Sequence, residues 1–444
     1  MLRFGTDGVR GDAATDLDSS SVAALGRAVA QALGAKRFLI GRDTRASGPR
    51  IEAAFAAGLA AAGAGARSLG VMPTPAIAFT AAREGMPAVI VSASHNPWSD
   101  NGLKIVGADG RKCTDAQEDA IEAASAGSAP VAVPPEPALS FGADARAEAA
   151  YRSHLLGALG GRSLDGLRVV LDCANGAAFR VGPEVLREAG AEVTAINADP
   201  DGRNINDGCG STHPDALRSE VVARGADLGL ALDGDADRVL AVDERGELVD
   251  GDQIIVMTAC DLHDRGELPG PGVVVTVMSN LGLRRALASA GIEVAETPVG
   301  DRHVVAAMHE LGYAVGGEQS GHVIYAAHAT TGDGLLTGAF VCDLVRRSGV
   351  PLSELAARMT RYPQVLVNVR VAQRAELDAS APLRDAIRAE TERLGDEGRV
   401  LVRASGTEPV VRVMAEAATE DEATQAAARL RDAVVAAFGG SGQP

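Results

Sequence analysis

The segment DGDAD carries three aspartates, Asp233, Asp235 and Asp237, each separated from the next by one residue. In an extended segment, residues two apart point to the same side, so this spacing predicts that the three carboxylates converge. At ~6 Å and an effective dielectric constant of ~20, each pair of carboxylates would repel by roughly 2 to 3 kcal/mol, which a divalent cation would more than offset. The segment therefore predicts a site for a hard, oxygen-ligated ion such as Mg²⁺.

Two other interpretations of DGDAD compete with this metal site, a solvated Asp/Gly turn and an EF-hand loop. Glu244 stands at the twelfth position counted from Asp233, as it would in an EF-hand. The sixth position is Arg238 instead of the glycine that the sharp turn requires, and the flanking segments are typical of strands. The EF-hand is excluded on these grounds, and the solvated turn stays open.

SASHNP places Ser94 beside His95 after a strand-like segment. The following Asn-Pro pair predicts a sharp turn that exposes the serine hydroxyl, which makes Ser94 a candidate nucleophile. The sequence has no G-x-S-x-G at this place, which weakens the hypothesis of a hydrolase triad. A simple polar turn is the alternative, but a hydroxyl combined with magnesium-binding carboxylates is the arrangement that phosphoryl transfer uses.

The segment RASGTEP is a candidate anion-binding loop. Its arginine supplies a planar fork for phosphate oxygens, and its hydroxyls and backbone N–H groups can wrap an anion. The residues concerned are Arg403, Ser405, Gly406 and Thr407, with Arg412 nearby in the chain. The alternative is an ordinary Ser/Gly/Thr hairpin turn.

Other segments offer weaker signals for phosphate, proton or sugar binding. Arg10 lies between glycines in FGTDGVRG, and Lys104 in DNGLKI is a candidate for proton transfer. GEQSGH supplies Glu318, Ser320 and His322, which together could bind sugar hydroxyls or an amine. Each segment could equally be a solvated surface.

The composition narrows the classes of function. The chain has 444 residues, of which 42 are basic and 59 are acidic, for a net charge of -17, and only 3% are aromatic. This argues against a nucleic-acid or anionic-membrane surface, so an anionic substrate would need a local cluster of arginines. No signal peptide and no uncharged apolar run of ~18 residues is found, which predicts a cytoplasmic protein. Five scattered cysteines without a C-x-x-C pair predict packing roles rather than zinc or redox chemistry.

The order of the elements predicts the fold class. Strand-like and Ala/Leu-rich helical segments alternate, and the pattern restarts twice before a smaller C-terminal segment. We therefore expect an α/β protein, with three related α/β domains containing mixed or parallel sheets, a smaller α+β domain, and a frayed GGSGQP terminus. Because ligands bind at the carboxyl ends of parallel strands, the polar segments should form one site between domains. The expected boundaries are 1–144, 145–252, 253–361 and 362–444.

Together these segments resemble the α-D-phosphohexomutase superfamily, in the right order over nearly the whole chain. The resemblance implies four domains around a central cleft, which carry in turn a phosphoserine, a metal site, sugar recognition and phosphate binding. It implies that phosphorylated Ser94 holds Mg²⁺ together with Asp233, Asp235 and Asp237. It further implies that Lys104 and His322 transfer protons and that Arg10 and Arg238 support the phosphoserine region. By the same resemblance, Glu318 and Ser320 contact the sugar. The substrate phosphate would be held by Arg403, Ser405, Gly406 and Thr407.

Within the superfamily, FGTDGVRG, Gln319, GDRHV at 300–304 and TTGDG at 330–334 are similar to members that act on glucosamine phosphates. The implied reaction interconverts glucosamine 6-phosphate and glucosamine 1-phosphate through a 1,6-bisphosphate, and feeds amino-sugar nucleotide and cell-wall precursor synthesis. Bacterial relatives suggest a homodimer. The alternatives are a phosphomannomutase or phosphoglucomutase, and a metal-dependent phosphatase. A catalytically dead binding protein is disfavoured because Ser94 and all three aspartates are present.

Overall fold

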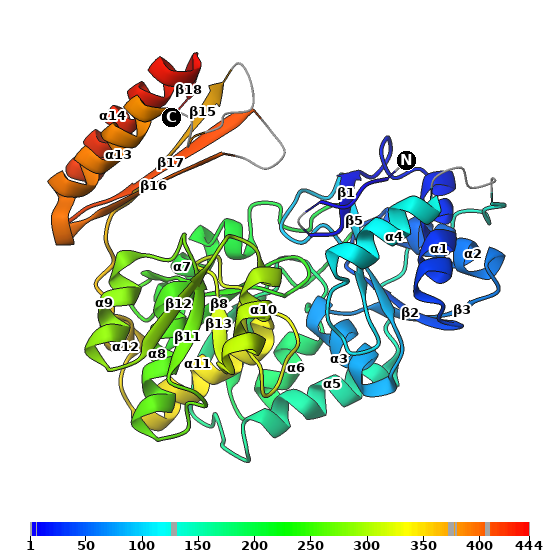
Figure 1. Cartoon of the computed structure of the whole chain (residues 1–444). Helices are drawn as coiled ribbons and strands as arrows, with labels where there is room; N and C mark the ends of the chain where they lie inside the picture. Colours follow the sequence, from blue (N-terminus) through cyan, green and yellow to red (C-terminus); the bar gives the residue numbers. More distant parts are fainter. Residues whose placement is uncertain are drawn as a thin grey trace. The chain divides into compact units, whose positions relative to one another are not determined.

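The computed structural model describes residues 2–5, 7–125, 131–371, 377, 380–404 and 409–443, without the side chains of 440–443. The chain divides into two compact units, Met1–Met278 with Ile292–Arg358, and Ser279–Gly291 with Met359–Pro444. The first unit contains three mixed sheets, and the second, smaller unit contains an antiparallel sheet (Figure 1). The predicted fold class is confirmed, while the exact domain boundaries stay a prediction.

The first sheet has the strand order β1-β5-β4-β2-β3. β2 pairs in parallel with β3 and β4, whereas β5 pairs antiparallel with β4 and β1. The strands are β1 (Val9–Asp12), β2 (Arg37–Arg42), β3 (Gly65–Val71), β4 (Ala88–Val91) and β5 (Asp100–Val106).

Helices cover both faces of this sheet. Phe38 of β2 is buried in one cluster with Leu25 and Phe55, which come from two neighbouring helices. On the other face, Gly41 of β2 lies directly against Ile77. The helices are α1 (Ser19–Leu33), α2 (Gly48–Ala61) and α4 (Asp115–Ser125) on the first face and α3 (Thr74–Glu84) on the second.

The second and third sheets repeat the plan of the first. In each, the first strand lies between the second and the third, all parallel, and the fourth pairs antiparallel with the third. The three units are therefore variations on one plan, as the sequence pattern predicted. The second sheet contains β6 (Arg168–Asp172), β7 (Glu192–Ile196), β8 (Leu228–Leu232), β9 (Val239–Asp243) and β10 (Leu248–Val249), and the third contains β11 (Gly272–Thr276), β12 (Glu293–Thr297), β13 (Val315–Gly317) and β14 (Val323–Tyr325).

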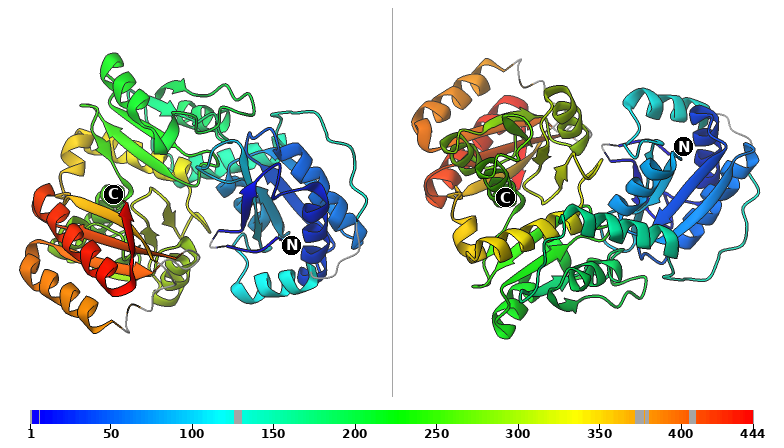
Figure 2. Two further views of the ribbon diagram at one scale, coloured as in Figure 1. Left: turned by 90° about the horizontal axis from the view of Figure 1, so that it is seen from above. Right: turned by 90° about the horizontal axis from the view of Figure 1, so that it is seen from below.

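One largely buried helix connects these two sheets. α11 (Gly334–Ser348) packs against β8 and β9 of the second sheet and β14 of the third, and it also contacts α5 (Ala145–Ala158), as Figure 2 shows. No helix among the described residues is both long and apolar enough to cross a membrane. The remaining helices are α6 (Val181–Glu188), α7 (Asp215–Arg224), α8 (Gly251–Asp264), α10 (Asp301–Leu311) and α12 (Leu352–Ala356), with a 3₁₀ turn at Gly210–Thr212.

The second unit contains the sheet β16-β17-β15-β18, in which every pairing is antiparallel. β18 (Gly440–Gln443) pairs with the end of β15, so the prediction of a frayed terminus is wrong. Backbone pairing with β15 orders this segment even though its composition is rich in glycine. The other elements are α9 (Leu281–Ser289), β15 (Gln364–Val371), α13 (Ala381–Leu394), a 3₁₀ turn at Gly395–Glu397, β16 (Arg399–Ala404), β17 (Val410–Glu416) and α14 (Glu420–Phe438).

The repeated plan places three turns at equivalent positions. In each mixed sheet, the chain leaves the third strand and turns back into the antiparallel fourth strand. We refer to these as the β4–β5 turn (residues 92–99), the β8–β9 turn (233–238) and the β13–β14 turn (318–322). They carry SASHNP, DGDAD and the EQSGH part of GEQSGH, so the same position of each repeat holds one of the predicted chemical segments.

The packing of α1 against α2 can be tested at Gly58. A Cβ atom at Gly58 would lie 2.0 Å from the carbonyl oxygen of Ala23 and 2.8 Å from the amide nitrogen of Arg27. Gly58→Ala should therefore push the helices apart and lower the free energy of unfolding by at least about 1 to 3 kcal/mol, measured as a lower melting temperature. Gly157→Ala in α5 is the matched control, because a Cβ there meets nothing within 4 Å. Equal melting temperatures for the two variants would contradict this packing.

Candidate active site

Ser94 is held in a strained, buried turn. Its φ angle is +53°, in the left-handed region, and the residue is only 1% exposed. The prediction that the turn exposes the hydroxyl is therefore wrong, because the hydroxyl packs against the carboxylate of Asp233 from the second sheet's β8–β9 turn. Instead, the Ser94 backbone N–H donates to the hydroxyl oxygen of Ser92 at 2.9 Å, and its own hydroxyl faces the β8–β9 turn.

Two side chains that the sequence analysis did not select fix the β4–β5 turn. The fully buried guanidinium of Arg45 donates to the carbonyl oxygens of Ser94 and Asn96, each at 2.9 Å. The Asn206 amide donates to the same two oxygens at 2.8 and 3.1 Å. Asp43 accepts from Arg45 Nε at 2.9 Å. The sequence could have indicated Asp43 and Arg45, because they follow the end of β2, which lies at the same sheet edge as Ser94.

The three aspartates converge by a different route from the one predicted. The β8–β9 segment is a tight turn rather than an extended strand: the Ala236 N–H donates to the Asp233 carbonyl at 3.0 Å, and Ala236 has φ +57°. Gly234 is required here, because a Cβ would lie 2.6 Å from the Ser94 carbonyl oxygen. One oxygen from each of Asp233, Asp235 and Asp237 lies within 4.8 Å of the others.

Ser94 and Asp233 join the two turns directly. The Ser94 hydroxyl donates to Asp233 Oδ2 at 2.5 Å and lies 3.2 Å from His95 Nδ1. The backbone N–H of Arg238 donates to the other Asp233 oxygen at 3.2 Å. Burial and the carboxylates of Asp237 and Asp235 raise the pKa of Asp233 well above its usual range. Burial, together with the cations Arg238 and Arg10, lowers the pKa of His95 to about 4.

The aspartate cluster has the features of a metal site. All three residues are at least 96% buried, so the interpretation as a solvated turn is wrong, and the flanking strands β8 and β9 agree with the exclusion of an EF-hand. Asp235 Oδ1 and Asp237 Oδ1 are buried without a hydrogen-bond partner among the described residues. Buried carboxylate oxygens with no donor within hydrogen-bond distance suit a hard divalent cation. The cluster can therefore hold a metal ion.

Lys104 balances part of this negative charge. Its Nζ is buried and lies 3.0 Å from Asp235 Oδ2, 3.4 Å from Asp237 Oδ2 and 3.2 Å from Asp7 Oδ2. Burial alone would lower the pKa of Lys104, but the Asp235 and Asp7 carboxylates outweigh it and raise the pKa well above its usual value. In this arrangement Lys104 is a cation that can donate a proton.

His322 lies on the opposite side of Asp237. Its Nδ1 is 3.7 Å from Asp237 Oδ1 and its Nε2 is 3.6 Å from Asp301 Oδ2. The Gly332 N–H donates to Nε2 at 3.0 Å, so the neutral ring carries its proton on Nδ1, toward Asp237. Burial lowers the pKa of His322, but the Asp237 and Asp301 carboxylates produce a net rise. His322 can thus accept and return a proton.

Three further predicted residues surround this group. Arg10 donates to the Ala93 carbonyl at 3.1 Å and forms an ion pair with Asp7, so it supports the β4–β5 turn. In the β13–β14 turn, Glu318 Oε1 accepts from the Gly300 N–H at 3.2 Å. The Ser320 hydroxyl is buried without a hydrogen-bond partner in the described parts of the chain. Both Glu318 and Ser320 therefore keep acceptor or donor capacity.

The second unit carries the predicted phosphate-binding arginines. Arg403 on β16 and Arg412 on β17 are directly opposite each other in the sheet. Burial and the neighbouring Arg412 charge lower the pKa of Arg403, as expected for a cation beside a second cation. Ser405, Gly406 and Thr407 lie outside the described residues.

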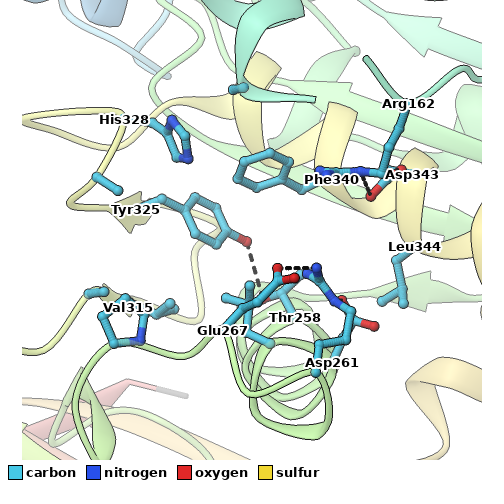
Figure 3. Close-up of a pocket in the computed structure, with 16 residues that line it drawn as sticks. Arg162, Thr258, Asp261, Glu267, Val315, Tyr325, His328, Phe340, Asp343 and Leu344 are labelled. Atoms are coloured by element: carbon cyan, nitrogen blue, oxygen red, sulfur yellow. Dashed lines mark hydrogen bonds and ion pairs between the residues drawn. The ribbon is translucent and has the colours of Figure 1, made fainter. Parts of the chain in front are cut away.

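A pocket of about 230 Å³ lies elsewhere in the first unit, between α8, α11 and the β13–β14 strands (Figure 3). Its Arg162 is paired with both carboxylate oxygens of Asp343 at 2.9 and 3.0 Å, and the Tyr325 hydroxyl donates to Thr258 at 3.1 Å. The described residues that line it include none of the predicted site residues. Its cations are already neutralised, so it does not compete as a phosphate site.

Comparison with known proteins identifies the family. Four segments match, in order, the alpha/beta/alpha domains I, II and III and the C-terminal domain of the phosphoglucomutase/phosphomannomutase family, at residues 1–130, 150–246, 250–362 and 366–433. The phosphoglucosamine mutase of Frankia alni is 53% identical over 455 residues, covering 98% of both chains. That of Mycolicibacterium paratuberculosis is 50% identical over 446 residues, covering 98% of this chain and 99% of the relative. The chain belongs to the phosphoglucosamine mutases of this family.

Solved phosphohexomutase structures share the fold. A phosphoglucomutase/phosphomannomutase family protein from Burkholderia thailandensis superposes with a TM-score of 0.81 at 26% identity, over 98% of each chain. The Aspergillus fumigatus N-acetylphosphoglucosamine mutase, solved with GlcNAc-6P and magnesium, has a TM-score of 0.72 at 22% identity, over 99% of this chain and 96% of that one. The second comparison supports the fold alone.

The metal site can be tested by cation binding. Mg²⁺ should bind the full chain and raise its melting temperature, because the cation relieves repulsion among the buried carboxylates. Asp237→Asn should weaken binding at least about tenfold, measured by isothermal titration calorimetry. Glu310→Gln, at an exposed position of α10, is the matched control. Unchanged affinity in Asp237→Asn would show that the aspartates do not hold the cation.

Proposed function

We propose that this chain interconverts glucosamine 6-phosphate and glucosamine 1-phosphate through a phosphorylated Ser94 and a glucosamine 1,6-bisphosphate. The observation that carries the proposal is the buried Ser94 hydroxyl, 2.5 Å from Asp233 at the edge of a cluster of three carboxylates. The similarity to phosphoglucosamine mutases at about half identity over nearly the whole chain supports the choice of substrate.

Asp233, Asp235 and Asp237 would hold Mg²⁺ together with phosphorylated Ser94, and the ion would neutralise negative charge on the moving phosphoryl group. The chain supplies the rest of the chemistry through fixed groups. Arg45 and Asn206 hold the carbonyl oxygens of the β4–β5 turn, which keeps Ser94 Oγ in one place throughout the reaction.

The reaction consists of two half-reactions at Ser94. In the first, the Oγ–P bond breaks as a new bond forms between phosphorus and sugar O1, and the O1 proton passes to a basic group. The bisphosphate then turns around. In the second, Ser94 Oγ takes the phosphoryl group from O6, and a proton is returned to that oxygen. The opposite direction uses the same steps in reverse.

Lys104 and His322 are the proton carriers that we propose. Lys104 is ion-paired and protonated, which suits a donor, whereas His322, beside the Asp237 carboxylate, can take up a proton. Which of them serves each half-reaction depends on the orientation of the sugar. Lys104 and His322 both contact the Asp237 carboxylate. The protonation of one side chain therefore affects the protonation of the other through this shared partner.

Sugar and phosphate binding complete the proposal. Glu318 and Ser320 would contact the sugar, and the unpartnered buried hydroxyl of Ser320 supports this role. Arg403 and Arg412, with Ser405, Gly406 and Thr407, would hold the phosphate that does not react. The remaining predictions rest on the sequence and the family. They are domain boundaries at 144, 252 and 361, a cytoplasmic location, a homodimer, and independence from nucleic acids and membranes.

The nucleophile is tested by Ser94→Ala. Loss of the hydroxyl that donates to Asp233 should lower kcat at least about 10³-fold and remove a phosphoryl adduct from the intact mass of protein treated with glucose 1,6-bisphosphate. Ser99→Ala, in the same turn, is the control. Normal turnover by Ser94→Ala would refute the proposal, and release of inorganic phosphate instead of the isomer would identify a phosphatase.

Specificity is tested with glucosamine, glucose and mannose 6-phosphates under one set of conditions. A charge-assisted hydrogen bond from the substrate ammonium to a desolvated carboxylate is worth roughly 1.5 to 3 kcal/mol. We therefore expect kcat/KM for glucosamine 6-phosphate to exceed the other two by at least about tenfold. A preference for mannose or glucose 6-phosphate would favour a phosphomannomutase or phosphoglucomutase, and would leave the Ser94 chemistry unaffected.

A further inference from the structure

Six charged or protonatable side chains of the first unit form a closed ring of contacts in which acidic and basic groups alternate. Lys104 Nζ lies 3.2 Å from Asp7 Oδ2, and the other Asp7 oxygen pairs with Lys112. Lys112 Nζ lies 2.7 Å from Asp301 Oδ2, which is 3.6 Å from His322 Nε2. The ring closes through Asp237, which is 3.7 Å from His322 and 3.4 Å from Lys104.

The ring joins segments that are far apart in the chain. Asp7 precedes β1, Lys112 follows β5, and Asp301 begins α10 at the edge of the third sheet. The proposed function uses Lys104, His322 and Asp237, but it gives no role to Asp7, Lys112 or Asp301. These three form a second path between the two proposed proton carriers, on the side away from the Asp237 contact.

Lys112 is the centre of this second path. Its side chain is 18% exposed and the Asp301 side chain 12%, so solvent screens their attraction only partly. Burial lowers the pKa of Lys112, but the Asp301 and Asp7 carboxylates raise it overall, so the side chain is cationic. Without this cation, Asp7 and Asp301 would be two largely buried carboxylates that share no basic partner.

The remaining basic partners would then have to serve both carboxylates. Asp7 has Lys104 and Arg10, and Asp301 has His322. Stronger attraction of Lys104 to Asp7 draws it away from Asp235 and Asp237, and stronger attraction of His322 to Asp301 draws it away from Asp237. Both changes displace a proton carrier from the reacting oxygen, and displacements of about 1 Å can cost about 100-fold in rate.

We infer that Lys112 is a positioning residue, which acts through Asp7 on Lys104 and through Asp301 on His322 to hold both proton carriers at the reaction centre. The inference rests on the proposed function. Lys112 contacts Asp7 and Asp301 rather than Ser94 or the proposed metal-binding carboxylates, so it reaches the reaction centre through the ring. Its loss should change kcat far more than KM.

The test compares Lys112→Met, Lys112→Arg and Arg111→Met as full-length proteins. Arg111 is an exposed neighbour on the same loop, so Arg111→Met controls for the loss of one positive charge there. Lys112→Met should lower kcat about 10- to 100-fold with KM within about threefold of the wild type. Lys112→Arg should recover most of this loss, and Ser94 phosphorylation by glucose 1,6-bisphosphate should remain complete in every variant.

A second measurement does not depend on turnover. In protein labelled with ¹⁵N-histidine, the imidazole nitrogen shifts of His322, assigned by comparison with His322→Asn, should move in Lys112→Met and stay in place in Arg111→Met. The inference would be overturned if Lys112→Met had the kcat of the wild type. It would also be overturned if kcat fell together with the melting temperature while the His322 shifts did not move. If Lys112→Met does not fold, Asp301→Asn is measured in the same way, with the same expected and contrary outcomes.

The two proposals fail in different ways. A wild-type protein that isomerises none of the hexose phosphates contradicts the proposed function, whatever the variants do. A wild type that turns over, with Lys112→Met equal to Arg111→Met in both kcat and His322 shifts, contradicts only the role of Lys112.

Discussion

Three carboxylates buried in a single tight turn are the feature to which the surrounding structure has to adapt. Like charges at this spacing repel, and each loses its hydration. Several described neighbours of Asp233, Asp235 and Asp237 reduce that cost: the Ser94 hydroxyl and the Arg238 N–H donate to Asp233, and Lys104 contacts the other two. The oxygens left without a donor are those that a divalent cation would bind. The proposed nucleophile, the buried lysine and the candidate metal site can therefore be traced to one electrostatic problem.

The repeated sheet explains how the parts meet. The turn from the third strand to the antiparallel fourth strand lies at the carboxyl end of parallel strands, which is the edge where ligands bind in α/β proteins. Because three mixed sheets repeat this turn, the fold offers the same kind of position three times, and it carries the serine, the aspartates and the sugar-binding candidates. Glycine at 234 lets the second turn approach the first within contact distance of the Ser94 carbonyl.

Sequence reasoning predicted the elements better than their contacts. Strong local patterns such as RFLIGRD and DLGLAL gave strands β2 and β8, and the cysteines that it assigned to packing are all free and buried. It placed Ser94 and the aspartates at strand ends, but it treated DGDAD as extended and Ser94 as exposed, because turn geometry and burial depend on distant segments. Arg45 and Asn206 were missed for the same reason: each acts on carbonyl oxygens that only the folded chain brings near. β18 was missed because a glycine-rich terminus has little propensity, and pairing with β15 provides its order.

A reaction that runs through one nucleophile in both directions requires the two proton carriers to be fixed relative to that nucleophile and not to the sugar, which must turn around. In the proposed reaction, acidic partners that Lys104 and His322 share would meet this requirement. Asp237 contacts both Lys104 and His322, and belongs to the same turn as Asp233, which accepts from Ser94. The path through Asp7, Lys112 and Asp301 restrains the same two side chains from the other side. A carrier held from two sides keeps its place whichever sugar oxygen arrives, so one rigid set of charges can serve both half-reactions.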